Sequence, residues 1–378
     1  MRTGCGLRLR ALMLVLLLVA APLARAATTA ATETGELERA SYRIDVPAHW
    51  NRELVVFFHG YATSPIVFRR GTRLSPMFEP ILREGFAIIQ SGYSRTGWAV
   101  EEGSADSERL RRLFVARHGK PLRTYAMGMS MGGTLTVMAL ESAPATYAGG
   151  LSLCGVIEPT DRMAQRDFAL RAAFDYYYPG VLGPLVPVDP AFHPDRATVA
   201  RVSAAMAADP KGFDALRALY GAGDRQSLPD VITFISYEIA ELQRRTGGNP
   251  FGNADLVYAG PADADALNDG VRRYRAEPKA AAYLARWYTP SGRLSRPLLA
   301  LHDTRDPLVI PATAFEYALL AQRAGHADKF VQQYVKAEGH CVFTAQQIGQ
   351  AFDELVTWAR DGKRPAPGLQ HDPSRPGP

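Results

Sequence analysis

Apolar and polar positions alternate along this chain in two ways, as short apolar runs and as longer stretches with helical spacing. The short runs are typical of buried strands, and they cover residues 42–46, 54–58, 86–90, 124–127, 150–154, 298–302 and 330–335. The longer stretches predict helices at about 104–118, 131–142, 312–324 and 344–360. Because the two kinds of segment take turns, the pattern predicts an α/β fold with a mostly parallel sheet flanked by helices.

This alternation stops in the middle of the chain. Residues 156–295 carry helical patterns and many prolines but no clear strand, and the strand pattern resumes at Pro297. A stretch of this length cannot be a structureless loop inside a compact domain. We therefore expect a mainly helical cap, inserted into a core made of residues 39–155 and 296–362. An independent second domain is the alternative.

Both ends of the chain differ from the rest. Residues 1–26 combine arginines, an apolar core at 11–21 and the sequence Ala24-Arg25-Ala26, a pattern typical of a cleaved signal peptide. An uncleaved membrane anchor is the alternative. We expect residues 27–38 to form a loose leader and residues 363–378, which are rich in proline and glycine, to form a disordered tail. The chain is thus expected to be secreted or periplasmic.

The net charge bears on whether the chain binds nucleic acid. The formal charge of +5 falls to +1 when residues 1–26 are removed, because that segment holds four arginines and no acid. No basic patch interleaved with aromatic residues remains, so a nucleic-acid partner is not indicated. No later run is long and apolar enough for stable membrane insertion. The oligomeric state does not follow from the sequence.

One serine stands in a turn that suits a nucleophile. The sequence Gly128-Met-Ser-Met-Gly132 follows the apolar run at 124–127 and precedes a predicted helix. A strand that enters a tight turn of this kind holds the serine in a strained conformation and exposes its Oγ. Glycines on either side are needed because a Cβ there would crowd the opposing backbone. Ser130 is therefore the candidate nucleophile.

Two further side chains follow strands that come later in the chain. Asp306 lies shortly after the strand at 298–302, and His340 follows the strand at 330–335. Functional groups in open parallel sheets gather at the carboxyl ends of strands. The imidazole of His340 could take the proton of the serine, and the carboxylate of Asp306 could orient that imidazole. Asp303 and, more distantly, Glu158 are the competing candidates for the acid.

An acyl-transfer site also needs donors for a negatively charged oxygen. The backbone N–H of Met131 follows the nucleophile at the start of a helix. The backbone N–H of Tyr61 is the second expected donor, because Gly60 leaves the turn after the strand at 54–58 free to adopt an unusual shape. His59 is expected to pack and to shape this turn.

Together these residues resemble those of the α/β-hydrolase superfamily. The resemblance covers about 54–155 and 297–360, and it rests on His59-Gly60-Tyr61, Gly128-x-Ser130-x-Gly132, Asp306 and Gly339-His340. The segments around the three catalytic candidates look like those of secreted esterases and of the prolyl-oligopeptidase-like group. The resemblance implies a serine hydrolase that needs neither a metal nor an organic cofactor.

The position of Cys341 suggests a more specific comparison. Tannases and feruloyl esterases have a disulfide that ties the neighbour of the histidine to a cysteine beside the nucleophile. Here Met129 precedes Ser130, so only half of that pattern is present. Cys154 ends the strand expected next to the nucleophile strand, and the resemblance leads us to expect a disulfide from Cys154 to Cys341. Two buried free thiols are the alternative.

The expected activity is the hydrolysis of carboxylic esters of small molecules through an acyl-enzyme intermediate. An aminopeptidase-like serine peptidase is one alternative. It would need acids that hold a substrate amine, and Glu238 and Glu241 have helical spacing in the cap, although such pairs more often lie on a solvated helix face. A non-catalytic binding module is the other alternative. The aromatic residues Phe174, Tyr176, Tyr177, Tyr178 and Trp98 could line a substrate pocket or simply pack the cap.

Overall fold

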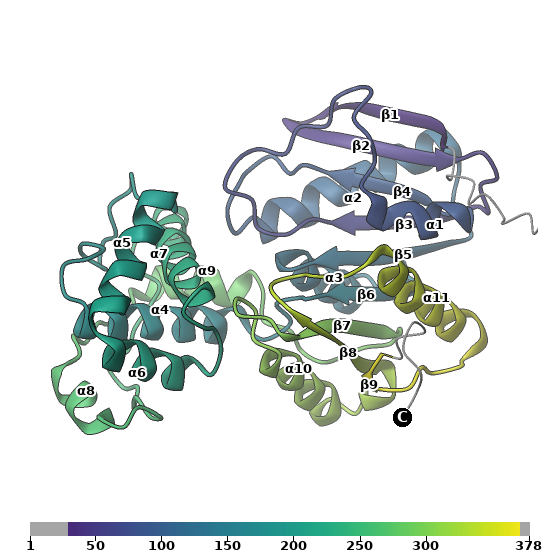
Figure 1. The fold of residues 1–378 in the computed structure, drawn as a ribbon. Coiled ribbons are helices and arrows are strands. Elements are labelled where there is room, and N and C mark those ends of the chain that lie inside the picture. Colours follow the sequence, from purple (N-terminus) through teal and green to yellow (C-terminus); the bar gives the residue numbers. More distant parts are fainter. Residues whose placement is uncertain (1–28, 371–378) are drawn as a thin grey trace, which may run out of the picture.

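A single sheet runs through the molecule, which we describe from a computed structural model covering residues 29–370 (Figure 1). The spatial order of its strands is β1-β2-β4-β3-β5-β6-β7-β8-β9. The strands from β3 and β4 to β9 pair in parallel, whereas β1 and β2 pair antiparallel with each other and β2 pairs antiparallel with β4. Their bounds are Thr29–Leu37 (β1), Ala40–Pro47 (β2), Glu53–Phe58 (β3), Ala87–Ser91 (β4), Arg123–Met129 (β5), Gly149–Leu153 (β6), Leu298–Arg305 (β7), Phe330–Glu338 (β8) and Gly368–Leu369 (β9).

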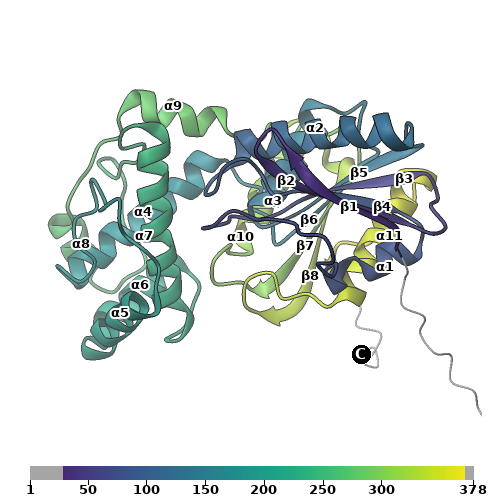
Figure 2. The ribbon, with the colours of Figure 1, turned by 90° about the horizontal axis from the view of Figure 1, so that it is seen from above.

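Helices cover both faces of this sheet. One face carries α1 (Glu79–Arg83) and α11 (Ala345–Asp361), and the other carries α2 (Val100–His118), α3 (Met131–Ser142) and α10 (Ala312–Arg323) (Figure 2). Short 3₁₀ turns at Pro76–Phe78 and Ala327–Lys329 precede α1 and β8. Successive side chains of a strand point to opposite faces, so Leu298 and Leu299 of β7 join different apolar clusters. The expected α/β sheet with helices on both faces is confirmed.

Between β6 and β7 the chain forms a helical insertion. It contains α4 (Thr160–Tyr177), α5 (Arg196–Ala208), α6 (Pro210–Tyr220), α7 (Ser227–Thr246), α8 (Ala264–Gly270) and α9 (Pro278–Arg286). These helices stand beyond one end of the sheet, on the left in Figure 1. One apolar cluster runs without interruption from Leu135 of α3 to Met163 of α4 and Ile232 of α7. The insertion therefore shares a core with the sheet.

Two segments near the ends are more ordered than the sequence led us to expect. The expected loose leader at 27–38 is wrong for its described part, because residues 29–37 form β1 along β2. Glu33 of β1 also accepts a 2.7 Å hydrogen bond from Arg117 of α2. Such an edge strand is held by backbone pairing and charged contacts, so it lacks an apolar run. Residues 1–26, the expected signal peptide, lie outside the described residues.

The expected disordered tail at 363–378 is wrong for its first residues as well. Gly368 and Leu369 form β9 beside β8, and the N–H of Gln370 donates to the carbonyl of Tyr334 at 2.8 Å. Arg364 also donates to the carbonyl of Phe330 at 2.8 Å. The rest of the predicted tail, 371–378, lies outside the described residues. Within 29–370, no helix is both long enough and apolar enough to cross a membrane.

Candidate active site

Ser130 lies at the end of β5, in the sharp turn that leads into α3. Its backbone has φ +57° and ψ −123°, a left-handed conformation that costs energy for a residue with a side chain. The turn is held by its own backbone: the N–H of Ser130 donates to the carbonyl of Leu153 at 2.9 Å, and its carbonyl accepts from the N–H of Gly133 at 2.8 Å. A Cβ on Gly132 would collide with the carbonyl of Phe58. These contacts explain why residue 132 is a glycine, and they fix the direction of the Ser130 Oγ.

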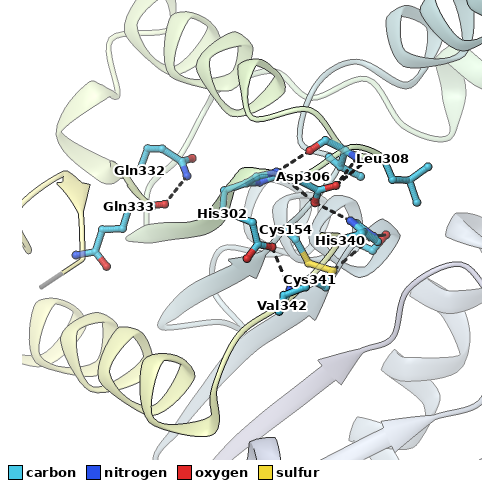
Figure 3. A network of polar contacts seen from close by, with 12 residues as sticks. Cys154, His302, Asp306, Leu308, Gln332, Gln333, His340, Cys341 and Val342 are labelled. Atoms are coloured by element: carbon cyan, nitrogen blue, oxygen red, sulfur yellow. Dashed lines mark hydrogen bonds and ion pairs between the residues drawn. A yellow bond between two sulfur atoms is a disulfide. The ribbon is translucent and has the colours of Figure 1, made fainter. Parts of the chain in front are cut away.

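The structure brings His340 and Asp306 to this serine. The Oγ of Ser130 lies 2.8 Å from Nε2 of His340, and Nδ1 of the same ring lies 2.7 Å from Oδ2 of Asp306. Asp306 follows β7 and His340 follows β8, so three segments far apart in sequence meet at the carboxyl ends of β5, β7 and β8 in one sheet. In Figure 3 the imidazole of His340 faces Asp306. A hydrogen-bonded chain of hydroxyl, imidazole and carboxylate is the result.

The carboxylate of Asp306 is held in place by its own loop. Its Oδ1 accepts from the N–H groups of Leu308 at 2.9 Å and Val309 at 3.0 Å, which leaves Oδ2 for His340. The side chain is buried, so the carboxylate depends on these donors for its solvation. His302 lies nearby, and burial lowers its pKa. Its Nε2 donates to the carbonyl of Val309 at 2.7 Å, so this second histidine supports the loop of Asp306.

The two competing acids have other partners. Oδ2 of Asp303 accepts from the N–H of Val342 at 3.2 Å, and burial raises the pKa of this carboxyl to about 6. Glu158 accepts two hydrogen bonds from Arg166, at 2.7 and 2.8 Å. Of the three candidate acids, Asp306 is the one hydrogen-bonded to the imidazole of His340.

Cys154 and Cys341 form a disulfide, with their Cα atoms 5.3 Å apart (Figure 3). Cys154 follows β6 and is completely buried, and its N–H donates to the carbonyl of Leu301 in β7. Cys341 directly follows His340. The bond therefore joins the loop that carries the imidazole to the buried centre of the sheet.

The two expected oxyanion donors come from the start of α3 and from the turn after β3. Met131 is the first residue of α3, where backbone N–H groups have no partner within the helix. Gly60 packs directly on Ser130, since a Cβ at this position would lie 3.0 Å from the Cβ of Ser130. The following residue, Tyr61, lines the same cavity as Ser130 and Met131. His59 stacks on Tyr93 with ring centroids 3.7 Å apart, and burial lowers its pKa to about 4, in keeping with a packing role.

The order of the parts settles the architecture. A serine after β5, an acid after β7 and a histidine after β8 lie along a mostly parallel sheet with two antiparallel strands at its edge. The chain has an α/β-hydrolase fold.

Comparisons with known proteins show distant similarity in structure only. No protein-family model matches the sequence, and no curated protein matches it. Among solved structures, a Pyrococcus horikoshii acylaminoacyl peptidase aligns with 86% of this chain and 40% of its own, at 10% identity and a TM-score of 0.45. The Pyrococcus furiosus esterase Pf2001 aligns with 86% of this chain and 90% of its own, at 11% identity and a TM-score of 0.44.

Est1E from Butyrivibrio proteoclasticus aligns with 86% of this chain and 99% of its own, at 10% identity and a TM-score of 0.44. This chain spans about two fifths of the acylaminoacyl peptidases that it matches. At these values the similarities concern the fold alone. The α/β-hydrolase assignment rests on the strand order and on the turn at Ser130.

A small cavity of about 30 Å³ opens beside Ser130. Ser130 and Met131 line it, and the rest of its lining comes from the core and from the insertion: Tyr61, Trp98, Val156, Met163, Arg166, Asp167, Phe234, Glu238, Leu308 and Val309. Trp98 was among the candidates from the sequence. The other aromatic candidates, Phe174 and Tyr176–Tyr178, are not part of this lining.

Those aromatic residues belong instead to the packing of the insertion. Phe174 is fully buried against Tyr178, whose hydroxyl donates to the carbonyl of Asp209 at 2.7 Å. The expectation of a solvated helix face at Glu238 and Glu241 is wrong, because both side chains are buried. Asp167 also lines this cavity, although it was not among the candidates from the sequence. Its signal is a charge at the i+4 position between Met163 and Leu170 in an otherwise apolar stripe of α4.

Proposed function

We propose that this protein is a serine hydrolase that cleaves carboxylic esters through an acyl-enzyme intermediate. The observation that carries the proposal is the unbroken pair of hydrogen bonds from Ser130 through His340 to Asp306, at 2.8 and 2.7 Å. Both distances lie within the range that proton transfer between these groups requires. The strained backbone of Ser130 supports it further, because strain of this kind persists where the surroundings impose it.

The reaction would begin with attack of the Ser130 Oγ on the ester carbonyl, while Nε2 of His340 takes the hydroxyl proton. The C–O bond to the alcohol then breaks, and the imidazolium returns the proton to the leaving oxygen. Water repeats the attack on the acyl group, again with His340 as the base, and releases the carboxylic acid. Asp306 remains ionised throughout and stabilises the imidazolium. The backbone N–H groups of Met131 and Tyr61 would bind the oxyanion in both halves.

The insertion would act as a cap that selects substrates, since Asp167, Phe234 and Glu238 reach the cavity from it. We also infer export to an oxidising compartment, where the disulfide between Cys154 and Cys341 would persist. The segment at 1–26 would direct that export and then be removed.

A fluorophosphonate probe tests the proposal, because it reacts with an activated serine and needs no knowledge of the substrate. We expect the folded wild-type protein to be labelled and the Ser130→Ala variant to remain unlabelled. Asp303→Asn serves as a matched control, and it should still be labelled because Asp303 does not contact the imidazole. Absence of labelling in folded wild-type protein would favour the non-catalytic binding module.

A second experiment separates esters from amides. The wild-type protein should hydrolyse 4-nitrophenyl esters of short acids faster than the corresponding 4-nitroanilides. The reverse preference would favour the aminopeptidase-like alternative.

A further inference from the structure

Two carboxyl groups of the insertion line the cavity beside Ser130. Asp167 comes from α4 and Glu238 from α7, and the two residues are 7% and 6% exposed. Neither belongs to the proposed hydrogen-bonded chain of catalytic groups. A buried carboxylate is unfavourable unless it is paired or hydrogen-bonded. The partners of these two acids therefore indicate whether they are structural.

The nearest arginine is shared between two acids. Arg166 donates to both oxygens of Glu158, and its Nε forms an ion pair with Oδ1 of Asp167 at 3.6 Å, which is longer than a hydrogen bond. That Oδ1 is buried and has no hydrogen-bond partner. Asp167 thus presents an unsatisfied acceptor to the cavity.

Glu241, one turn further along α7, has the hydrogen bonds expected of a buried structural carboxylate. Its two oxygens accept from the N–H of Trp98 at 3.1 Å and from Nε of Arg245 at 2.7 Å. Glu238 is influenced instead by charges: Asp167 and Glu241 repel its carboxylate, and Arg166 attracts it. The two acids at the cavity therefore outnumber the one cation that faces them.

The remaining walls suit a cation as well. Tyr61, Trp98 and Phe234 contribute aromatic rings to the same cavity, and ring faces attract positive charge. The hydroxyl of Tyr61 is also buried without a hydrogen-bond partner, so its oxygen is another free acceptor. Two carboxyl groups and three aromatic rings thus share the lining with Arg166 and several apolar side chains.

The raised pKa values of Asp167 and Glu238 are consistent with a site for a positively charged group. Burial raises the pKa of Asp167 to about 7, and burial together with the charge of Asp167 raises the pKa of Glu238. The charged and titratable groups that face these two carboxyls are Glu158 just before α4, Arg166 of α4, Tyr220 of α6, Glu241 of α7 and Tyr61 after β3. A cation bound between the carboxyls would favour their ionised forms.

We propose that the cavity beside Ser130 binds a positively charged group of the substrate, a primary ammonium, between Asp167 and Glu238. This inference rests on the proposed function and narrows its substrates to esters that carry an amine near the scissile carbonyl. A primary ammonium fits better than a quaternary one, because it can donate N–H groups to the unsatisfied oxygens.

A binding measurement tests the inference without catalysis. In the Ser130→Ala variant, alaninamide should bind at least about tenfold more tightly than isobutyramide, which replaces the ammonium by a methyl group of similar size. Adding Glu238→Gln and Asp167→Asn should abolish this difference. Adding Asp214→Asn, which removes an exposed acid of α6, should leave it unchanged. Equal binding of the two amides, or a difference that survives both substitutions, would overturn the inference.

Turnover gives a second measurement. The ratio of kcat/KM for the 4-nitrophenyl esters of alanine and isobutyric acid should favour the alanine ester at least about tenfold, and Glu238→Gln should lower that ratio by a similar factor. If Ser130-dependent hydrolysis occurs with equal rates for both esters, the inference fails and the proposed function stands. If neither ester is hydrolysed, the proposed function fails, and the binding measurement still decides the inference.

Discussion

The disulfide between Cys154 and Cys341 should stabilise the fold strongly, because it closes a very long loop. The two cysteines are 187 residues apart in sequence. In the chain-entropy model, a cross-link over such a loop removes enough freedom from the unfolded chain to stabilise the folded state by about 5 kcal/mol. Replacing both cysteines by alanine should therefore lower the free energy of unfolding by about this amount and Tm by about 10 °C.

The same change should reduce activity. Cys341 adjoins His340, and after removal of the disulfide the loop would keep the 3.2 Å hydrogen bond from the N–H of Val342 to Asp303. We expect the imidazole to sample positions away from the Ser130 hydroxyl, so kcat should fall more than KM rises. A misplacement of about 1 Å can reduce the rate by about a hundredfold.

Urea unfolding at 25 °C, followed by circular dichroism, measures the stability of the wild-type and double-alanine proteins. Asp303→Asn is the matched control for activity, since it weakens the hydrogen bond from the N–H of Val342 to residue 303 and keeps the disulfide. Thiol titration of the full-length protein under denaturing, non-reducing conditions should find one free thiol, that of Cys5. Three free thiols, or an unfolding free energy within about 1 kcal/mol of wild type after the double substitution, would refute the reasoning.

Four further predictions concern the site and its support. Asp306→Asn should lower kcat roughly ten-thousandfold in an ester assay while circular dichroism stays unchanged, because the imidazole loses its orienting carboxylate. Gly60→Ala should lower kcat by up to about a hundredfold, since the added methyl group would press on the Cβ of Ser130 at 3.0 Å. Arg245→Met should lower the free energy of urea unfolding by about 3–5 kcal/mol, because at the interface of insertion and core it leaves Glu241 without a cation and Glu102 with Arg95 alone. The pKa of Asp167 is higher in the folded state, at about 7, than in the unfolded chain, so its ionisation should reduce the free energy of unfolding as the pH rises from about 4 to about 7. Asp167→Asn should remove that part of the pH dependence in urea titrations. An unchanged slope of the unfolding free energy against pH would contradict this prediction.

The strands of the core could be predicted because they are buried on both faces. A strand such as β3, whose six residues are all buried, appears in the sequence as a continuous apolar run from Leu54 to Phe58. The turn at Ser130 could be predicted as well, since only glycine fits beside it. The strands β1 and β9 escaped prediction for the opposite reason. They lie at the two edges of the sheet, where backbone pairing suffices and an apolar run is not needed.

The acids of the insertion were harder to predict because local spacing does not show what a helix faces. Glu238 and Glu241 have the spacing of a solvated helix face, and the sequence contains no sign that the core loop with Trp98 lies against them. Asp167 lies next to Arg166, which suggests a purely local ion pair, although the hydrogen bonds of Arg166 go to Glu158 and its Nε stays 3.6 Å from Asp167. The role of each charge is set by contacts between segments far apart in the chain.

The two acids on one face of α7 have different roles: Glu238 lines the cavity, and Glu241 attaches the helix to the core. Residues three positions apart are neighbours on one face of a helix, so the contacts of Glu241 fix where Glu238 points. Glu241 binds the N–H of Trp98 and, with Glu102 of α2, shares the guanidinium of Arg245. Because these contacts join the insertion to the core, they also set the position of Glu238 relative to Ser130. The loop with Trp98, which forms part of the cavity lining, thus holds α7, the helix that we propose selects the substrate. Substrate selectivity and the attachment of the insertion therefore depend on the same hydrogen bonds of Glu241 and Arg245.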